Sequence, residues 1–189
     1  MLYRDHLKRP CDVLISGLSL LTLSPILILT AIAIRLEDGG PALFCQQRVG
    51  RSGRCYRMFK FRSMPVNVET LPSAKASGLK ITRVGQILRR TNIDELPQLF
   101  NILKGDMSVV GPRPSLPSQE DLAELRRANG SSECRPGLTG LAQVSSYDGM
   151  SEQEKARFDG DYALNISFRN DFRIMLRTFS YLAHRPPTY

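Results

Sequence analysis

The longest hydrophobic stretch of the chain covers residues 13–34 and contains no charged side chain. A helix rises about 1.5 Å per residue, so this stretch is long enough to cross a hydrocarbon core of about 30 Å. The pattern therefore predicts a membrane helix. A cleaved signal peptide fits less well, because the apolar stretch is too long and no A-x-A-like site follows it.

Two features favour a helix that enters and leaves the membrane by the same face. Ser24 and Pro25 lie at its middle, where proline removes a helical hydrogen bond and kinks the chain. Both flanks are basic, with Arg4, Lys8 and Arg9 before the stretch and Arg35, Arg48, Arg51, Arg54, Arg57, Lys60 and Arg62 after it. The positive-inside tendency keeps both flanks in the cytosol. A re-entrant helix accounts for both features. A kinked helix that spans the membrane accounts for the proline but not for basic residues on both sides.

Alternation of apolar and polar residues predicts a β-hairpin after this helix. Two strand-like runs, residues 42–48 and 54–62, flank a loop that contains glycine. In the second run, alternation places Lys60 and Arg62 on one face and two phenylalanines on the core face. The two cations then either point at a common target or are solvated on an exposed strand.

The apolar positions between residues 96 and 103 predict a short amphipathic helix. Thr91 or Asn92 is its N-cap, and either choice places Asp94 or Glu95 at the third helical position, where a carboxylate completes a capping box. Four residues at i, i+3, i+4 and i+7 form its apolar stripe: Leu96, Leu99, Phe100 and Leu103.

Asp94 and Glu95 are adjacent, and arginines lie on both sides of them in the sequence. A helix over residues 84–90 brings Arg89 to them, and Arg113 stands between two prolines that restrict the backbone. The two carboxylates either cap the helix and compensate its dipole, at about 0.3–1 kcal/mol each, or they form a metal and phosphate site.

The last predicted helix covers residues 170–183 and has two different faces. One face is apolar and the other basic: Phe172, Met175, Leu176 and Phe179 against Arg169, Arg173 and Arg177. This pattern is typical of a helix that lies at a membrane surface. It fits equally a helix that packs on the core of the domain and leaves its arginines in solvent.

The composition adds a requirement for an anionic partner. The 189 residues carry a formal net charge of +8, which suits nucleic acid, a phosphorylated substrate or an anionic membrane surface. The four cysteines have neither C-x-x-C spacing nor neighbouring histidines, so they indicate reduced thiols rather than a zinc site or a disulfide framework. No Walker-type phosphate loop is present.

The run DELPQLFNILKGDMSVVGPRP, with KFRSM before it and RPGLTG after it, closely resembles the monotopic phosphoglycosyl transferases, a family of bacterial sugar transferases. The similarity covers residues 8 to about 181. It implies a small membrane-associated fold, α/β but mostly α, with a re-entrant helix broken at Ser24 and Pro25, a short β-hairpin and several amphipathic helices. Residues 1–38 then form the basic flank and membrane helix, and residues 39–189 form a cytosolic catalytic domain.

The resemblance also implies a reaction, in which a phospho-sugar passes from a UDP-sugar to a polyprenol phosphate such as undecaprenyl phosphate and UMP is released. The expected location is the cytosolic face of the bacterial inner membrane, in contact with lipids and without nucleic acid. Asp94 is the expected nucleophile and ligand of Mg²⁺, and Glu95 helps to hold the metal or the arginines. The candidate phosphate contacts are Lys60, Arg62, Arg89, Arg113 and Arg135.

Lys8, Arg9 and Asp12 match a Lys-Arg-x-x-Asp element of the family. Either the two cations hold the membrane interface, or the three residues tether the helix, with Asp12 paired to an arginine. Two other functions stay open. One is direct transfer in a ternary complex, with Asp94 and Glu95 as metal ligands only. The other is a membrane-tethered protein that binds nucleic acid, although its cations should then cover a continuous face with aromatic platforms.

Overall fold

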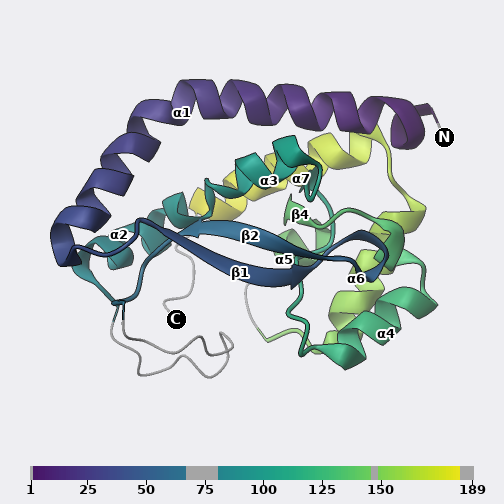
Figure 1. Ribbon diagram of the computed structural model, residues 1–189. Helices are drawn as coiled ribbons and strands as arrows, with labels where there is room; N and C mark the ends of the chain where they lie inside the picture. The colour runs from purple at the N-terminus through teal and green to yellow at the C-terminus, as the bar shows by residue number, and fades with distance from the viewer. Residues whose placement is uncertain (1, 67–80, 146–148, 184–189) are drawn as a thin grey trace.

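The computed structural model describes residues 2–66, 81–145 and 149–183 of the chain. A single long helix, α1 (Lys8–Asp38), follows a π-helical turn (Tyr3–Leu7) and passes over the rest of the molecule (Figure 1). Most of its large apolar side chains are exposed. Within the described ranges, it forms the one helix that is long and apolar enough to cross a membrane, by length and composition. The predicted apolar helix is therefore confirmed.

Helix α1 is bent about half-way along its length (Figure 1). Pro25 lies inside the helix there and has no N–H to donate to the carbonyl of Leu21. The hydroxyl of Ser24 donates to this carbonyl at 2.8 Å instead, so the oxygen that proline leaves free keeps a partner. The helix is bent and continuous, which corrects the predicted break. The re-entrant path stays a prediction.

The predicted β-hairpin is confirmed. Strands β1 (Leu43–Val49) and β2 (Cys55–Phe61) pair antiparallel through a short 3₁₀ turn. Met58 and Lys60 alternate onto one face of β2, and Met58 joins the larger hydrophobic core. Phe61 is buried in a second core cluster as expected, but Phe59 is only partly buried.

The chain between α2 (Arg83–Thr91) and α3 (Gln98–Lys104) differs from the predicted single capped helix. Asn92 has a left-handed backbone with φ of 55° and makes no side-chain cap, so it ends α2 instead of starting a capping box. A 3₁₀ turn (Ile93–Glu95) follows, and we call it the acidic turn. Pro97 then begins α3, where its missing N–H costs no helical hydrogen bond.

The buried face of α3 also differs from the predicted stripe. Leu99 is buried as expected, but Phe100 and Leu103 are 50% and 36% exposed. The helix is rotated because Asn101 turns inward, where its amide accepts from the N–H of Phe59 at 2.9 Å and donates to a carbonyl of β2 at 2.7 Å. The buried amide of Asn101 forms hydrogen bonds with the backbone of β2, and these bonds therefore set the orientation of α3.

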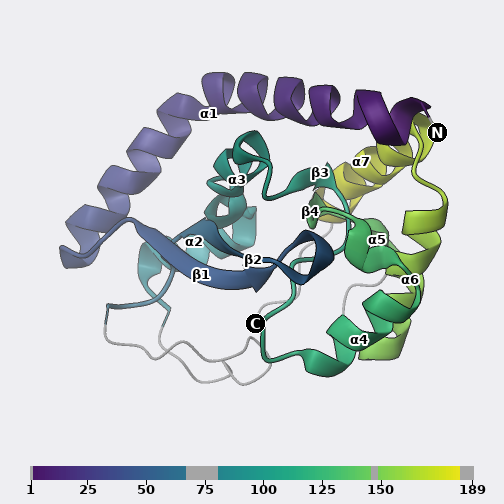
Figure 2. The ribbon, with the colours of Figure 1, turned by 45° about the vertical axis from the view of Figure 1, so that its right-hand side comes forward.

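The remaining elements complete a mostly helical domain, as predicted. A short parallel pair that the sequence did not indicate joins β3 (Ser108–Val110) to β4 (Gly137–Thr139). The other helices are α4 (Glu120–Ala128), α5 (Leu141–Ser145), α6 (Glu152–Leu164) and α7 (Phe168–Ala183). Helix α4 lies on the side of the molecule away from the first half of α1 (Figures 1 and 2).

Helix α7 packs on the core and also exposes apolar side chains. Ile174 is 1% exposed and belongs to the larger core, whereas Phe172, Leu176 and Phe179 are exposed. The predicted helix is confirmed, and it packs on the core through Ile174. Contact of its exposed apolar side chains with a membrane surface stays a prediction.

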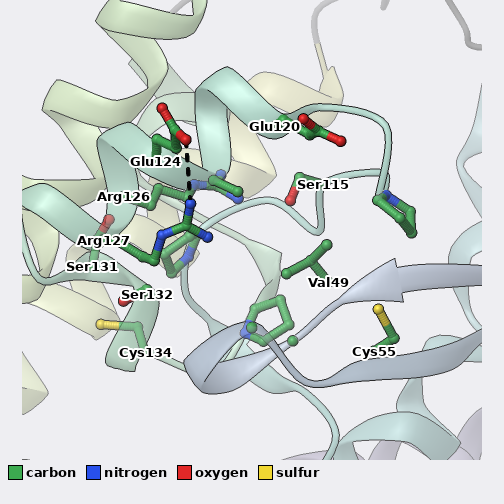
Figure 3. Close-up of a pocket in the computed structure, with 16 residues that line it drawn as sticks. Val49, Cys55, Ser115, Glu120, Glu124, Arg126, Arg127, Ser131, Ser132 and Cys134 are labelled. Carbon is green, nitrogen blue, oxygen red and sulfur yellow. Dashed lines mark ion pairs between the residues drawn. The ribbon is translucent and has the colours of Figure 1, made fainter.

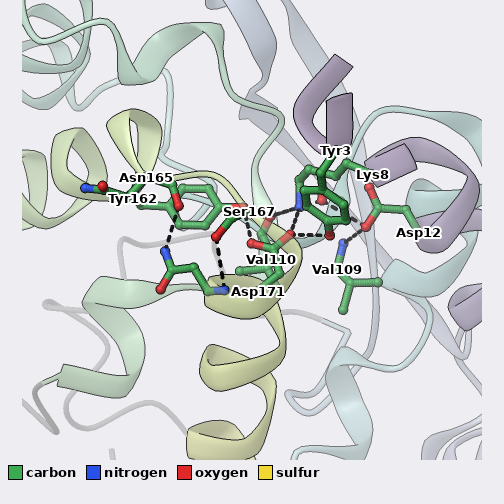
Figure 4. Close-up of polar contacts among 11 residues, drawn as sticks. Tyr3, Lys8, Asp12, Val109, Val110, Tyr162, Asn165, Ser167 and Asp171 are labelled. Carbon is green, nitrogen blue, oxygen red and sulfur yellow. Dashed lines mark hydrogen bonds and ion pairs between the residues drawn. The ribbon is translucent and has the colours of Figure 1, made fainter. Parts of the chain in front are cut away.

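Polar contacts tie the first turns of α1 to the core (Figure 4). Asp12 is 4% exposed, and its carboxylate accepts from the N–H of Val109 at 2.9 Å and from the hydroxyl of Ser108 at 3.0 Å. Lys8 donates to Asp171 of α7 at 2.6 Å. The structure therefore has the expected tether, but the partners of Asp12 are an amide and a hydroxyl rather than an arginine.

Candidate active site

The acidic turn presents Asp94 and Glu95 to one lysine of the hairpin. The ammonium of Lys60 lies 3.0 Å from Oε1 of Glu95 and 3.4 Å from Oδ2 of Asp94. Asp94 is 7% exposed, and the side chain of Glu95 is 23% exposed. Because Asn92 turns the chain sharply, the two neighbouring carboxylates face the end of β2 instead of solvent.

The surroundings of the two carboxyls shift their pKa values in opposite directions. Burial raises the pKa of Asp94, and the nearby Lys60 only partly opposes this effect. Burial also acts to raise the pKa of Glu95, but Lys60, Arg113 and Arg48 together outweigh it and lower that pKa. Adjacent carboxyls with such divergent environments are common where one group reacts and the other holds charge.

Arg48 belongs to this site, although sequence reasoning counted it only among the flanking cations. It is partly buried, and its pKa is lowered first by burial and then by the charge of Arg113. The hairpin register could have revealed it. Arg48 lies opposite Tyr56, and Tyr56 is four residues before Lys60, so alternation puts both cations on one face.

Two predicted phosphate contacts, Arg89 and Arg113, do lie near the acidic turn. The charge of Arg89 contributes to the surroundings of Asp94, and its Nε donates to the hydroxyl of Ser63 at 2.9 Å. Arg113 is exposed and lies close enough to Glu95 to help lower its pKa. The side chain of Arg113 is therefore available to an anion at this site.

Arg62 is engaged elsewhere. It is 8% exposed, and its two terminal nitrogens bind the carboxylate of Asp38 at 2.7 and 2.5 Å. Its Nε also donates to the carbonyl of Pro41 at 2.8 Å. The planar fork of Arg62 thus fastens the end of α1 to the end of β2. Its predicted role as a phosphate contact is not supported by these bonds.

Arg135 lies at the other end of α3 from the acidic turn. Its Nε donates to the carbonyl of Gly105 at 3.0 Å. Arg9 of α1 donates to the carbonyls of Ile102 and Leu103 at the same helix end. Cations suit the carbonyl-rich end of a helix, so both arginines have a local structural explanation. The structure does not bring Arg135 to Asp94.

The two carboxylates of the acidic turn fit a magnesium ion. Mg²⁺ in phosphate-handling sites commonly takes one or two carboxylates and completes its shell with water and substrate oxygens. Over the described ranges, no group of three or more His, Cys, Asp or Glu side chains could hold a metal ion. Asp94 and Glu95 would therefore have to share the ion with a bound phosphate, and Lys60 competes for the same oxygens.

An apolar groove of about 410 Å³ adjoins the acidic turn. It lies between α3 and the outer face of the hairpin, and its lining consists of Leu43, Phe59, Pro97, Phe100, Leu103 and Lys104. Among its lining residues, Pro97, the N-cap of α3, comes two positions after Glu95. Phe100 and Leu103, which the sequence pattern had placed in the core, therefore line this groove.

The fold and the site together define a small membrane-associated domain with a charged site. Its paired carboxylates lie among cations, and the same small domain carries a long exposed apolar helix. A family model described as bacterial sugar transferase matches residues 3–185. The chain belongs to this family, as its motifs predicted.

Several bacterial relatives share most of this chain. It is 41% identical over 183 residues to a "UDP-glucose:undecaprenyl-phosphate glucose-1-phosphate transferase" of Caulobacter vibrioides, covering 92% of this chain and 68% of the relative. It is 37% identical over 205 residues to an "Undecaprenyl-phosphate galactose phosphotransferase" of Salmonella typhimurium, covering 97% and 42%. An "Uncharacterized sugar transferase" of Haemophilus influenzae is 36% identical, again with 97% and 42% covered. The chain thus spans less than half the length of several relatives.

Proposed function

We propose that this chain transfers a phospho-sugar from a UDP-sugar to a polyprenol phosphate and releases UMP. The observation that carries the proposal is the acidic turn, where Lys60 and nearby arginines surround two carboxylates in a domain with a membrane helix. The names of two relatives support the same substrate classes, because both include undecaprenyl phosphate and one includes UDP-glucose.

The proposed reaction has two displacements at one phosphorus atom. An oxygen of Asp94 attacks the β-phosphorus of the donor, the bond to the bridging oxygen breaks, and UMP leaves with that electron pair. An oxygen of the polyprenol phosphate then attacks the phospho-sugar on Asp94, and the carboxylate is released. The raised pKa of Asp94 supports this role, because a less stabilised carboxylate is a better nucleophile once ionised.

Lys60 and Glu95 have the supporting role in this scheme. The shorter contact of Lys60 is with Glu95, at 3.0 Å against 3.4 Å to Asp94, so Glu95 can keep the ammonium in place while Asp94 reacts. Arg113 and Arg89 then neutralise phosphate oxygens as charge develops. Mg²⁺, when bound by the two carboxylates and the donor, supplies further charge neutralisation of the phosphates.

We also propose a monotopic arrangement at the cytosolic face of the bacterial inner membrane. The bend at Pro25 and the basic residues on both sides of α1 support a helix that returns to the face it entered. The exposed apolar face of α7 supports contact with lipid. The apolar groove beside the acidic turn suits the isoprenoid chain of the acceptor, which must bring its phosphate to Asp94.

The decisive experiment uses Asp94→Asn in purified protein with undecaprenyl phosphate and a set of UDP-sugars in detergent. The variant is expected to lose UMP release and to trap no phospho-sugar on the protein. Glu95→Gln is expected to slow turnover through the lost support of Lys60 while adduct trapping persists. Near-normal transfer by Asp94→Asn would make a covalent role untenable.

Exchange of labelled UMP into UDP-sugar separates the remaining mechanisms. The covalent route allows this exchange without acceptor, whereas direct attack in a ternary complex does not. Retention on DNA or heparin without any UMP release would favour a nucleic-acid-binding protein instead.

A further inference from the structure

The backbone around Arg113 is held almost entirely through its carbonyl oxygens. Pro112 and Pro114 have no N–H to donate, so the loop cannot be fastened at those amides. Four successive carbonyls accept hydrogen bonds instead: Pro112 from the N–H of Gly137 at 2.8 Å, Arg113 from Arg126 at 3.0 Å, Pro114 from Arg48 at 3.2 Å, and Ser115 from the N–H of Val49 at 3.0 Å.

A cavity on one side of this loop makes these bonds important. It has a volume of about 360 Å³ and separates the loop and the hairpin tip from α4, with Ser115, Arg126 and Val49 among the side chains around it (Figure 3). Protein interiors are otherwise close-packed. On this side the loop borders open space rather than packed side chains, so the donors to its carbonyls help to fix its position.

Of these four donors, Arg126 is a buried side chain with an anchor of its own. It is 8% exposed, and its Nε and Nη2 both bind Oδ2 of Asp159 in α6, at 2.9 and 2.6 Å. Asp159 is 2% exposed. The same Nη2 donates to the carbonyl of Arg113. A planar guanidinium can make these bonds together, whereas the flexible point charge of a lysine would hold the geometry less firmly.

We propose that Arg126, oriented by Asp159, is a positioning residue that holds the Arg113 loop so that the Arg113 side chain stays beside Glu95. The inference rests on the proposed function in so far as Arg113 contacts the donor phosphates. Neither Arg126 nor Asp159 touches the reacting atoms. Their effect on the reaction passes through one backbone carbonyl.

The test must remove the hydrogen bond without leaving a buried charge unpaired. A double variant, Arg126→Met with Asp159→Leu, replaces the whole ion pair with apolar side chains, and such replacements are often neutral for stability. We call it the pair variant. Arg127→Ala is the matched control, because this neighbouring arginine has a 62% exposed side chain and an exposed partner. If the pair variant unfolds, Arg126→Lys takes its place.

The expected result is a fall of about tenfold in kcat/KM for the UDP-sugar, the effect of losing one hydrogen bond, with Tm little changed. Arg127→Ala should keep wild-type kinetics. A purely structural pair would not act through Arg113, so the pair variant is also made in an Arg113→Ala background. In that background the pair variant should lower kcat/KM by less than about twofold, because the Arg113 side chain that Arg126 positions is absent.

An equal loss in both backgrounds would overturn the proposal, as would wild-type kinetics in a folded pair variant. The wild type, the pair variant, Arg113→Ala and the combination of the last two are also titrated with UDP and Mg²⁺ by calorimetry, which needs no turnover. If the pair variant weakens UDP binding only when Arg113 is present, but the wild type releases no UMP, the proposed function is refuted and the positioning role is retained. Failure of the wild type to bind UDP would overturn both.

Discussion

Lys60 is the residue whose removal tests the site most directly. Within the described part of the chain, it is the residue that forms ion pairs with both Asp94 and Glu95. Lys60→Met keeps the length of the side chain and removes the charge, so two neighbouring carboxylates lose the cation between them. Charge-assisted hydrogen bonds contribute about 1.5–3 kcal/mol each. Because the side chain of Lys60 is 24% exposed, we take the lower end, about 1.5 kcal/mol, for the shorter contact.

This energy corresponds to a fall of roughly tenfold or more in kcat/KM for the UDP-sugar. The assay is UMP release at limiting donor, with exchange of labelled UMP as a second readout of the first displacement. Arg57→Met is the matched control, because Arg57 lies on the same strand, is exposed and changes the net charge equally. Equal rates for Lys60→Met and Arg57→Met would refute the reasoning, because the charge of Lys60 would then have no special position.

Three further predictions concern the parts around the site. Asp12→Ala should lower stability by about 2–4 kcal/mol, because two buried donors lose their acceptor, and Tm in detergent measures it. Phe100→Ser, in the apolar groove, should raise KM for undecaprenyl phosphate several-fold and leave KM for the UDP-sugar unchanged. Hydrogen bonds from Arg62 lower the pKa of Asp38. The ion pair therefore stabilises the folded state fully at pH values above the ordinary Asp pKa, and this stabilisation is lost as the pH falls through the lowered pKa. The Tm difference between wild type and Arg62→Met should therefore shrink on acidification.

The first two of these predictions have control variants, and the third has an outcome that would contradict it. Asp5→Ala changes an exposed acid before α1 and should leave Tm unchanged. Leu176→Ser changes a similarly exposed apolar residue of α7, so an equal rise in acceptor KM would show that membrane contact, not the groove, is responsible. A Tm difference for Arg62→Met that is constant with pH would contradict the role of Asp38.

Local patterns predicted the elements well because each depends on near neighbours. An uncharged apolar stretch becomes an exposed helix, and alternation on both sides of a glycine-containing loop becomes a hairpin. The error at Asn92 has a local cause too. Asn tolerates both an N-cap and a left-handed backbone, and only the packing of α2 against β2 selects the second. The parallel pairing of β3 with β4 joins distant residues, so periodicity could not reveal it.

The site was predicted less completely, because a positive charge does not reveal its partner. Asp94, Glu95 and Lys60 were found from their motifs, and they do lie together. Arg62 and Arg135 also carry a positive charge, but their bonds go to the ends of α1 and α3. A basic protein built from short helices needs cations for its helix termini as well as for its substrates.

In the proposed monotopic arrangement, the depth of the site in the membrane follows from where α1 is fastened. Near its start, Asp12 binds the N–H of Val109 in β3, and this strand continues into the loop of Arg113. At its end, Asp38 binds Arg62, two residues after Lys60. Each end of the membrane helix is thus bonded close to a cation that faces the acidic turn. Under the proposed function, shifting α1 in the bilayer would therefore shift the cations with it, so the helix would set the height at which the donor and a lipid-anchored phosphate meet.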